Sequence, residues 1–172
     1  MNKEYKKLFF LIGIFLIFVL FFVLYLSWPL ITGHEIILHT RPIDPFDIFR
    51  GQYMAITYDI SRLPLIPGIA KGDRIYVNLI ENESSGVWEY KEISLIKPNK
   101  ALFIKGYVEN INGGFLSVDY GIEQYFFERN AKINERIFAI SLKTDGFGNA
   151  RITSLLNSSL SPVIIDYSSS KL

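Results

Sequence analysis

The chain has 172 residues, of which 49% are hydrophobic and 15% are aromatic, and it contains no cysteine. Its 18 basic and 17 acidic side chains give a net charge of +1, which argues against nucleic-acid binding through a broad positive field. The lack of cysteine excludes disulfides, thiolate catalysis and cysteine-ligated metals.

The first predicted element is an apolar run from Leu8 to Trp28 that contains no charged residue. As a helix this run is about 30 Å long, the thickness of the hydrocarbon core of a bilayer, so we predict a transmembrane helix over residues 8–28. Lys3, Lys6 and Lys7 lie in a basic flank, residues 1–7. The positive-inside rule therefore predicts a cytoplasmic N-terminus and an extracytoplasmic C-terminal domain.

The apolar run is expected to stay attached as a signal anchor. A cleavable signal has an apolar core of about 7–15 residues followed by a small-residue cleavage site, whereas this run is longer and leads into Ser-Trp-Pro-Leu-Ile-Thr-Gly. Tyr25 and Trp28 suit the far membrane interface, and we expect Pro29 with Gly33 to end the helix.

Residues 34–167 are predicted to form one β-rich domain, and residues 168–172 a frayed tail. Its segments are short, rich in β-branched and aromatic residues, and separated by Gly, Pro, Asn and Ser. The predicted strands are Glu35–Thr40, Tyr53–Asp59, Arg74–Ile80, Trp88–Leu95, Ala101–Val108, Phe115–Asp119, Ile137–Leu142, Arg151–Leu155 and Val163–Tyr167.

Helical signal after the apolar run is weak. Ile122–Phe127 and Asn130–Glu135 are each expected to form a turn or a short helix. Strong turn signals lie at Asn82–Gly86, Asn112–Gly114 and Asp145–Asn149. The sequence therefore predicts an all-β domain, a mainly antiparallel sandwich or small open barrel, after an N-terminal transmembrane helix.

Polar residues concentrate just before the second predicted strand. Asp44 and Asp47 lie between Arg41 and Arg50, among prolines that stiffen the backbone. The favoured interpretation is structural: the carboxylates cap a turn and pair with an arginine, and Gly51 adopts a backbone conformation that other residues disfavour. The alternative is a binding or catalytic site.

The segment Arg50–Tyr58 resembles the signature of the membrane-anchored GDYXXLXY family, and Asp44–Asp47 is similar to the Asp-Pro-x-Asp segment that precedes it there. Later segments are similar to that family's later blocks in the same order: Lys71–Val77, Phe103–Val108 and Tyr120–Phe126. The resemblance implies a single-pass anchor and a β-rich exported domain, often encoded beside multi-spanning membrane proteins. It implies no activity.

Two positions depart from the signature. Gln52 replaces its Asp and Ile56 replaces its Leu, whereas Gly51, Tyr53 and Tyr58 match. An amide at position 52 forms hydrogen bonds but supplies no negative charge, so a metal-ligand or acid–base role there is in doubt.

The aromatic block Tyr120–Glu128 is the second candidate surface. At least half of its aromatic side chains are expected in the core, and the others could form a groove or a docking patch, because tyrosine combines an apolar face with a polar tip. Glu123 is the residue of most interest. We expect it to be partly buried and paired with Arg50 across the fold.

Metal and nucleophile interpretations have little support. His34 and His39 are five residues apart near the first strand, so alternation places them on opposite faces. Membrane-anchored signal peptidases also carry a β-rich domain, a Gly-Asp element like Gly72-Asp73 and a strand lysine like Lys105. In those enzymes a serine nucleophile works with the lysine, but Ser61 lacks the expected sequence neighbours. We therefore consider only a distant relation in fold, without an intact serine–lysine pair.

Together these patterns predict a membrane-anchored extracytoplasmic domain that acts as an accessory or interaction module of a cell-envelope membrane complex. The expected partners are the bilayer, through residues 8–28, and a multi-spanning membrane protein; no nucleic acid, metal, cofactor or catalytic residue is predicted. The alternative is a membrane-bound hydrolase or ligand-binding protein. The candidate binding residues are Asp44, Asp47, Arg50, Gly51, Gln52, Tyr53, Tyr58, Tyr120, Gly121, Glu123 and Tyr125.

Overall fold

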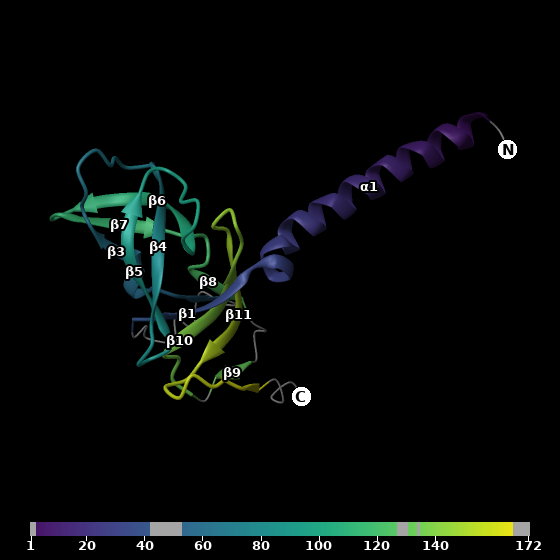
Figure 1. The fold of residues 1–172 in the computed structure, drawn as a ribbon. Helices are drawn as coiled ribbons and strands as arrows, with labels where there is room; N and C mark the ends of the chain where they lie inside the picture. Colours follow the sequence, from purple (N-terminus) through teal and green to yellow (C-terminus); the bar gives the residue numbers. More distant parts are fainter. Residues whose placement is uncertain (1–2, 42–52, 127–130, 134, 167–172) are drawn as a thin grey trace.

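A computed structural model describes residues 3–41, 53–126, 131–133 and 135–166 (Figure 1). A single long helix, α1 (Lys3–Thr32), leads into a β domain and projects away from it. The segment Tyr5–Thr32 is 28 residues long and, by length and composition, apolar enough to cross a membrane; none of its most apolar stretch is buried by the protein.

The helix ends at Thr32, just before Gly33, and not at Pro29, which lies inside α1. Proline removes its own N–H bond and crowds the preceding turn, but the residues after it remain free to stay helical. The Gly33 N–H donates to the Pro29 carbonyl (2.9 Å), and a Cβ at Gly33 would lie 2.2 Å from that oxygen, so only glycine fits. The Lys143 ammonium also donates to the Leu30 carbonyl (3.0 Å), which ties the end of the helix to the β domain.

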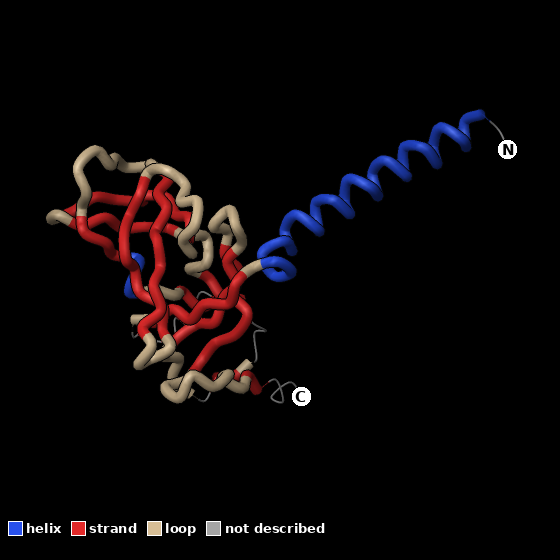
Figure 2. Tube along the Cα trace, in the orientation of Figure 1, coloured by secondary structure: helices blue, strands red, loops and turns tan. Residues whose placement is uncertain are grey.

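Outside α1 the chain is built mainly of strands and loops (Figure 2). Most of the β domain is one sheet of eight strands in the order β11-β10-β1-β5-β4-β6-β7-β3. Neighbouring strands are antiparallel except β1 and β5, which are parallel where Leu38 faces Trp88. The strands are β1 (His34–His39), β3 (Arg62–Pro64), β4 (Arg74–Asn82), β5 (Val87–Ser94), β6 (Phe103–Asn112), β7 (Phe115–Asp119), β10 (Ala139–Thr144) and β11 (Ala150–Leu156).

The sheet curls strongly. β10 and β6 lie four places apart in the strand order, yet the Thr144 hydroxyl donates to the Phe103 carbonyl (3.1 Å) and the Lys105 N–H donates to the Gly148 carbonyl (2.9 Å). The turn between β10 and β11 therefore closes onto β6, and the strands form a curled open sheet. This confirms the predicted all-β domain after an N-terminal helix.

Two short ribbons complete the domain. β2 (Tyr53–Ala55) pairs with β8 (Gln124–Phe126), and β9 (Lys132–Ile133) pairs with β12 (Ile165–Asp166). The turn or short helix expected at each of residues 122–127 and 130–135 is therefore replaced in part by a short strand, β8 in the first segment and β9 in the second. The predicted strand Tyr53–Asp59 is shorter in the structure, since β2 ends at Ala55 and Asp59 begins a 3-10 turn, η1 (Asp59–Ser61).

The core follows from alternation along the strands. On β4 the side chains of Ile75, Val77 and Leu79 point inward, as the period of two predicts. The fully buried apolar side chains from the other strands complete one continuous cluster: Ile36, Leu38, Leu63, Ile104, Val108, Leu116, Ile140 and Leu142.

Candidate functional site

Two tyrosines connect the end of the signature segment to the aromatic block, because each donates a hydrogen bond from its hydroxyl to a backbone carbonyl of the other segment. The Tyr58 hydroxyl donates to the Ile122 carbonyl (2.6 Å), and the Tyr120 hydroxyl donates to the Ile60 carbonyl (2.6 Å). Tyr58 is 0% exposed and Tyr120 is 8% exposed. Burial raises the pKa of both phenols, so each hydroxyl stays protonated and remains a donor. We call this contact the tyrosine lock.

Local hydrogen bonds position Tyr58, and a backbone bond joins the two segments beside it. The Tyr58 N–H donates to the Ser61 hydroxyl (3.1 Å), and the Ser61 N–H donates to the Tyr58 carbonyl (3.0 Å), which forms the turn η1. The Ile56 N–H donates to the Glu123 carbonyl (2.7 Å) and so extends the β2–β8 pairing toward the lock. The two segments therefore meet along main chain as well as side chains.

Two carboxylates organise the turn between β7 and β8. Glu123 accepts from the N–H groups of Tyr120 (2.6 Å) and Ile122 (2.8 Å), while Asp119 accepts from the N–H of Gly121 (2.8 Å). Gly121 has φ +74°, a conformation that L side chains rarely adopt. The turn is thus built around its acidic side chains.

The Glu123 carboxyl group has an unusual titration. Partial burial and a hydrogen bond with Asp119 raise the pKa of Glu123 from 4.5 to about 7, against the opposing effect of the backbone N–H donors. Because that pKa lies near neutrality, the Glu123 carboxyl is protonated at acidic pH and gains its negative charge near pH 7.

Glu123 lines an open cavity of about 680 Å³, which we call the Glu123 cavity. Its other charged lining residues come from well-separated parts of the chain: Arg41, Arg62, Glu109 and Asp119. Arg41 Nε lies 3.3 Å from Asp59 Oδ1, and the Arg62 guanidinium lies 4.2 Å from the centre of the Phe115 ring. The mixed charge is suited to a small polar ligand that carries both charges.

The predicted site residues divide into two groups. Tyr58, Tyr120, Gly121 and Glu123 meet at the lock and its turn, and half-buried Tyr125 lies on β8 opposite Met54 and packs against the core. Asp44, Asp47, Arg50, Gly51 and Gln52, and the side chain of Tyr53, lie outside the described residues, so the expected Arg50–Glu123 pair stays a prediction.

Sequence reasoning did not single out Asp59, Arg62 or Asp119. Asp119 did carry a signal, because an Asp two residues before a glycine is typical of an Asx-turn. Asp59 carried none, since its neighbours Arg41 and His39 are brought to it by the pairing of distant segments; His39 Nδ1 lies 2.9 Å from Asp59 Oδ2.

The structure gives no support to a serine–lysine pair. Lys105 donates to the side-chain oxygen of Asn149 (2.5 Å), whereas the Ser61 hydroxyl belongs to η1 and lines the Glu123 cavity. Within the described part of the chain, no group of three or more His, Asp or Glu residues is arranged to hold a metal ion.

Comparison with known proteins gives one match. The family model described as GDYXXLXY protein matches residues 15–155, from the middle of α1 to β11. No curated protein and no solved structure matches the chain.

Proposed function

The chain belongs to the GDYXXLXY family, and on that premise we propose that it is a single-pass membrane protein whose β domain is an accessory or interaction module of a cell-envelope membrane complex. In this proposal α1 spans the bilayer, the N-terminus is cytoplasmic and the β domain lies outside the cytoplasm.

The observation that carries the proposal is the exposure of α1. Its most apolar stretch is not buried at all by the protein, and side chains such as Phe10 and Phe18 are 70% and 66% exposed. Exposed apolar area on this scale is covered only by lipid or by other apolar helices. At Gly13 no atom lies within 4 Å of an added Cβ, so this face of α1 allows the close approach of a partner helix.

The orientation rests on charge. Lys3, Lys6 and Lys7 precede the apolar run, which favours a cytoplasmic N-terminus. A topology reporter fused after Leu172 is expected to be active outside the cytoplasm, and the protein should retain residues 1–28. Recovery of a soluble form that begins near Thr32 would contradict the anchor.

The interaction proposal is tested by purification from membranes in mild detergent. A multi-spanning membrane protein is expected to copurify with the full chain in a fixed ratio and to recover the chain reciprocally. A variant in which residues 8–28 are replaced by a Leu/Ala helix keeps the membrane anchor but changes the surface of the helix. Loss of the partner from this variant would assign the contact to α1, whereas retention would assign it to the β domain. If the partner is recovered equally by that helix fused to an unrelated domain, the interaction module is excluded.

A second candidate function is ligand binding or hydrolysis at the Glu123 cavity. It is favoured by the Asp119–Glu123 carboxyl pair, with the pKa of Glu123 near 7, in an open cavity that also holds two arginines. A thermal-shift screen with small amino acids and carboxylates tests it. A stabilising compound whose effect is lost in Glu123→Gln and kept in Glu92→Gln, an exposed glutamate on β5, would support this function over the module.

A further inference from the structure

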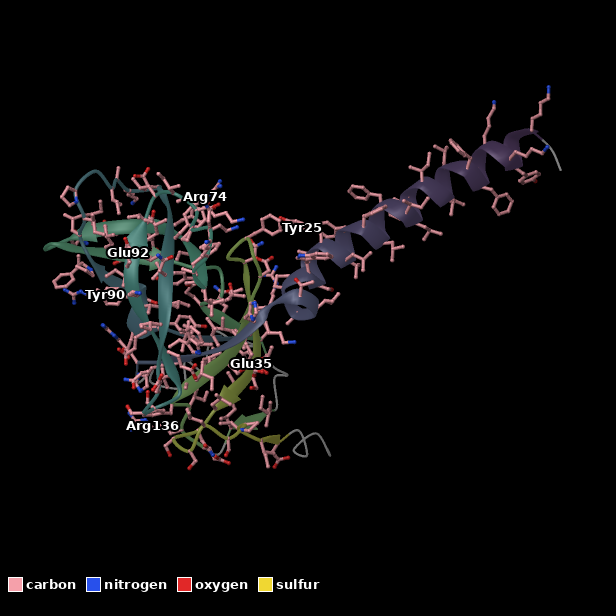
Figure 3. All side chains as sticks on the ribbon, viewed as in Figure 1. Tyr25, Glu35, Arg74, Tyr90, Glu92 and Arg136 are labelled. Atoms are coloured by element: carbon pink, nitrogen blue, oxygen red, sulfur yellow. The ribbon has the colours of Figure 1, made fainter. Side chains whose placement is uncertain are left out.

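A second cavity, of about 630 Å³, lies between α1 and the β domain. We call it the helix cavity. Leu24, Tyr25 and Trp28 of α1 form one wall, and Arg74, Lys97 and Lys105 contribute to the other. Figure 3 shows Tyr25 projecting from α1 on the side of the β domain where Arg74 lies. One wall is therefore apolar and aromatic, and the facing wall is basic.

The three cations of the helix cavity are not neutralised by carboxylates in the described part of the chain. The Lys97 ammonium lies 4.6 Å from the centre of the Phe147 ring, and the Arg74 guanidinium lies 5.8 Å from that of Tyr107. The Lys105 ammonium donates to a neutral amide, Asn149 Oδ1. These contacts orient the positive charges but do not cancel them.

Asp145 also lines the helix cavity, but its carboxylate is used within the β10–β11 turn. Oδ1 accepts from the N–H groups of Phe147 (2.8 Å) and Asn149 (2.9 Å), and Oδ2 accepts from the Asn149 side-chain amide (2.9 Å). Asp145 is 4% exposed. Three cations against one buried carboxylate leave the cavity with an excess of positive charge.

We propose that the helix cavity binds the headgroup of an anionic phospholipid from the bilayer that α1 crosses. This inference rests on the proposed membrane anchoring. The phosphate faces Arg74, Lys97 and Lys105, while the acyl chains follow the apolar surface of α1 past Leu24 and Phe21, which also lines the cavity. A single ligand of this class provides a negative charge for the basic wall and acyl chains for the apolar wall.

The length of α1 places the cavity at the right depth. The 28 residues of Tyr5–Thr32 extend about 42 Å, which exceeds the roughly 30 Å hydrocarbon core by about 12 Å. Part of the helix therefore lies among the headgroups, and Tyr25 and Trp28 are the residue types that favour this depth. A soluble anion satisfies the basic wall but leaves Phe21 and Leu24 uncovered, so the lipid is the better occupant.

The test uses the full chain in nanodiscs of phosphatidylcholine, with or without phosphatidylglycerol. After gentle extraction, the lipids retained by the protein are quantified by mass spectrometry, and hydrogen exchange is followed over residues 97–101 and 145–149. We expect enrichment of phosphatidylglycerol over the disc composition, and slower exchange in both segments when it is present.

Arg74→Gln with Lys97→Gln is the diagnostic variant, because both side chains are exposed and lie outside the core. Each cation removed is expected to lower the lipid preference about fivefold. The matched control is Lys91→Gln with Arg136→Gln, which removes the same charge at exposed positions that do not line the cavity and should leave the preference unchanged. Figure 3 shows Arg136 at the opposite end of the domain from Arg74.

Equal enrichment in the wild type and the diagnostic variant overturns the proposal, as does an equal loss in the control. Inorganic phosphate added to phosphatidylcholine discs is expected to leave exchange unchanged, and protection by phosphate alone would replace the lipid by a soluble anion. A chain that inserts into both discs without a lipid preference overturns this inference alone, whereas a chain that fails to insert overturns the membrane anchoring on which it rests.

Discussion

The tyrosine lock is expected to be a main determinant of the stability of the β domain. Tyr58→Phe removes one hydroxyl and little volume, and it leaves the Ile122 carbonyl buried without the donor that now lies 2.6 Å away. A buried polar group that loses its partner costs about 1–3 kcal/mol. Tyr120→Phe removes the equivalent donor from the Ile60 carbonyl and has the same expected cost.

The two bonds join the same two segments, so their losses should not be additive. Once one hydroxyl is gone, the segments at 58–61 and 120–123 are held less firmly and the second bond contributes less. The double variant is therefore expected to lose less stability than the sum of the single variants, with a coupling free energy of at least about 0.5 kcal/mol.

The assay is urea and thermal unfolding of the detergent-solubilised full chain, followed by near-UV circular dichroism, which reports the packing of aromatic side chains. For a domain of this size 1 kcal/mol corresponds to about 3–5 °C in Tm, so each single variant should melt about 3–15 °C lower. Tyr90→Phe, at a tyrosine 43% exposed on β5, is the control and should change the free energy of unfolding by less than about 0.5 kcal/mol. If both lock variants match this control, the hydroxyl bonds do not hold the segments together.

Two further predictions concern charge and backbone shape. The pKa of Glu123 is about 7 in the folded protein and 4.5 ordinarily, so the folded state holds a proton that the unfolded state releases. Stability should therefore fall as pH rises from about 5 to 7, and Glu123→Gln should flatten this part of the urea-midpoint profile; an unchanged slope would contradict the assignment. Gly148→Ala should cost at least about 2 kcal/mol, because φ is +80° and the added Cβ would lie 2.9 Å from the Lys105 backbone nitrogen. Gly146→Ala, in the same turn with nothing within 4 Å, is the control, and equal unfolding midpoints for the two variants would refute the steric argument.

The elements that could be predicted from the sequence are those whose signal is local. The alternation of Ile75, Val77 and Leu79 predicts a strand with one buried face, and β4 has that face. The prediction for Phe115–Asp119 coincides with β7, because Asn112-Gly113-Gly114 marks the turn before it. The length of the apolar run predicts α1 without any tertiary information.

The parts that could not be predicted depend on distant pairing. Gln124–Phe126 has no alternating pattern of its own and becomes a strand because Tyr53–Ala55, seventy residues earlier, supplies its hydrogen-bonding partners. Arg62–Pro64 ends in proline and carries a charge, features that disfavour a strand except at a sheet edge, which is where β3 lies. The Glu123 cavity is likewise assembled from segments that the sequence keeps far apart.

The described part of the signature therefore has a structural role in the fold and does not point to a binding or catalytic role. Tyr58 is buried and its hydroxyl bonds to a backbone carbonyl, so the closing tyrosine of the motif fixes the aromatic block in place and offers no group to a ligand. Cations that line the two cavities lie elsewhere: Arg41 and Arg62 in the Glu123 cavity, and Arg74 and Lys97 beside α1. A variant series aimed at function should begin with these cations, since changes at the lock would destabilise the fold on which every site depends.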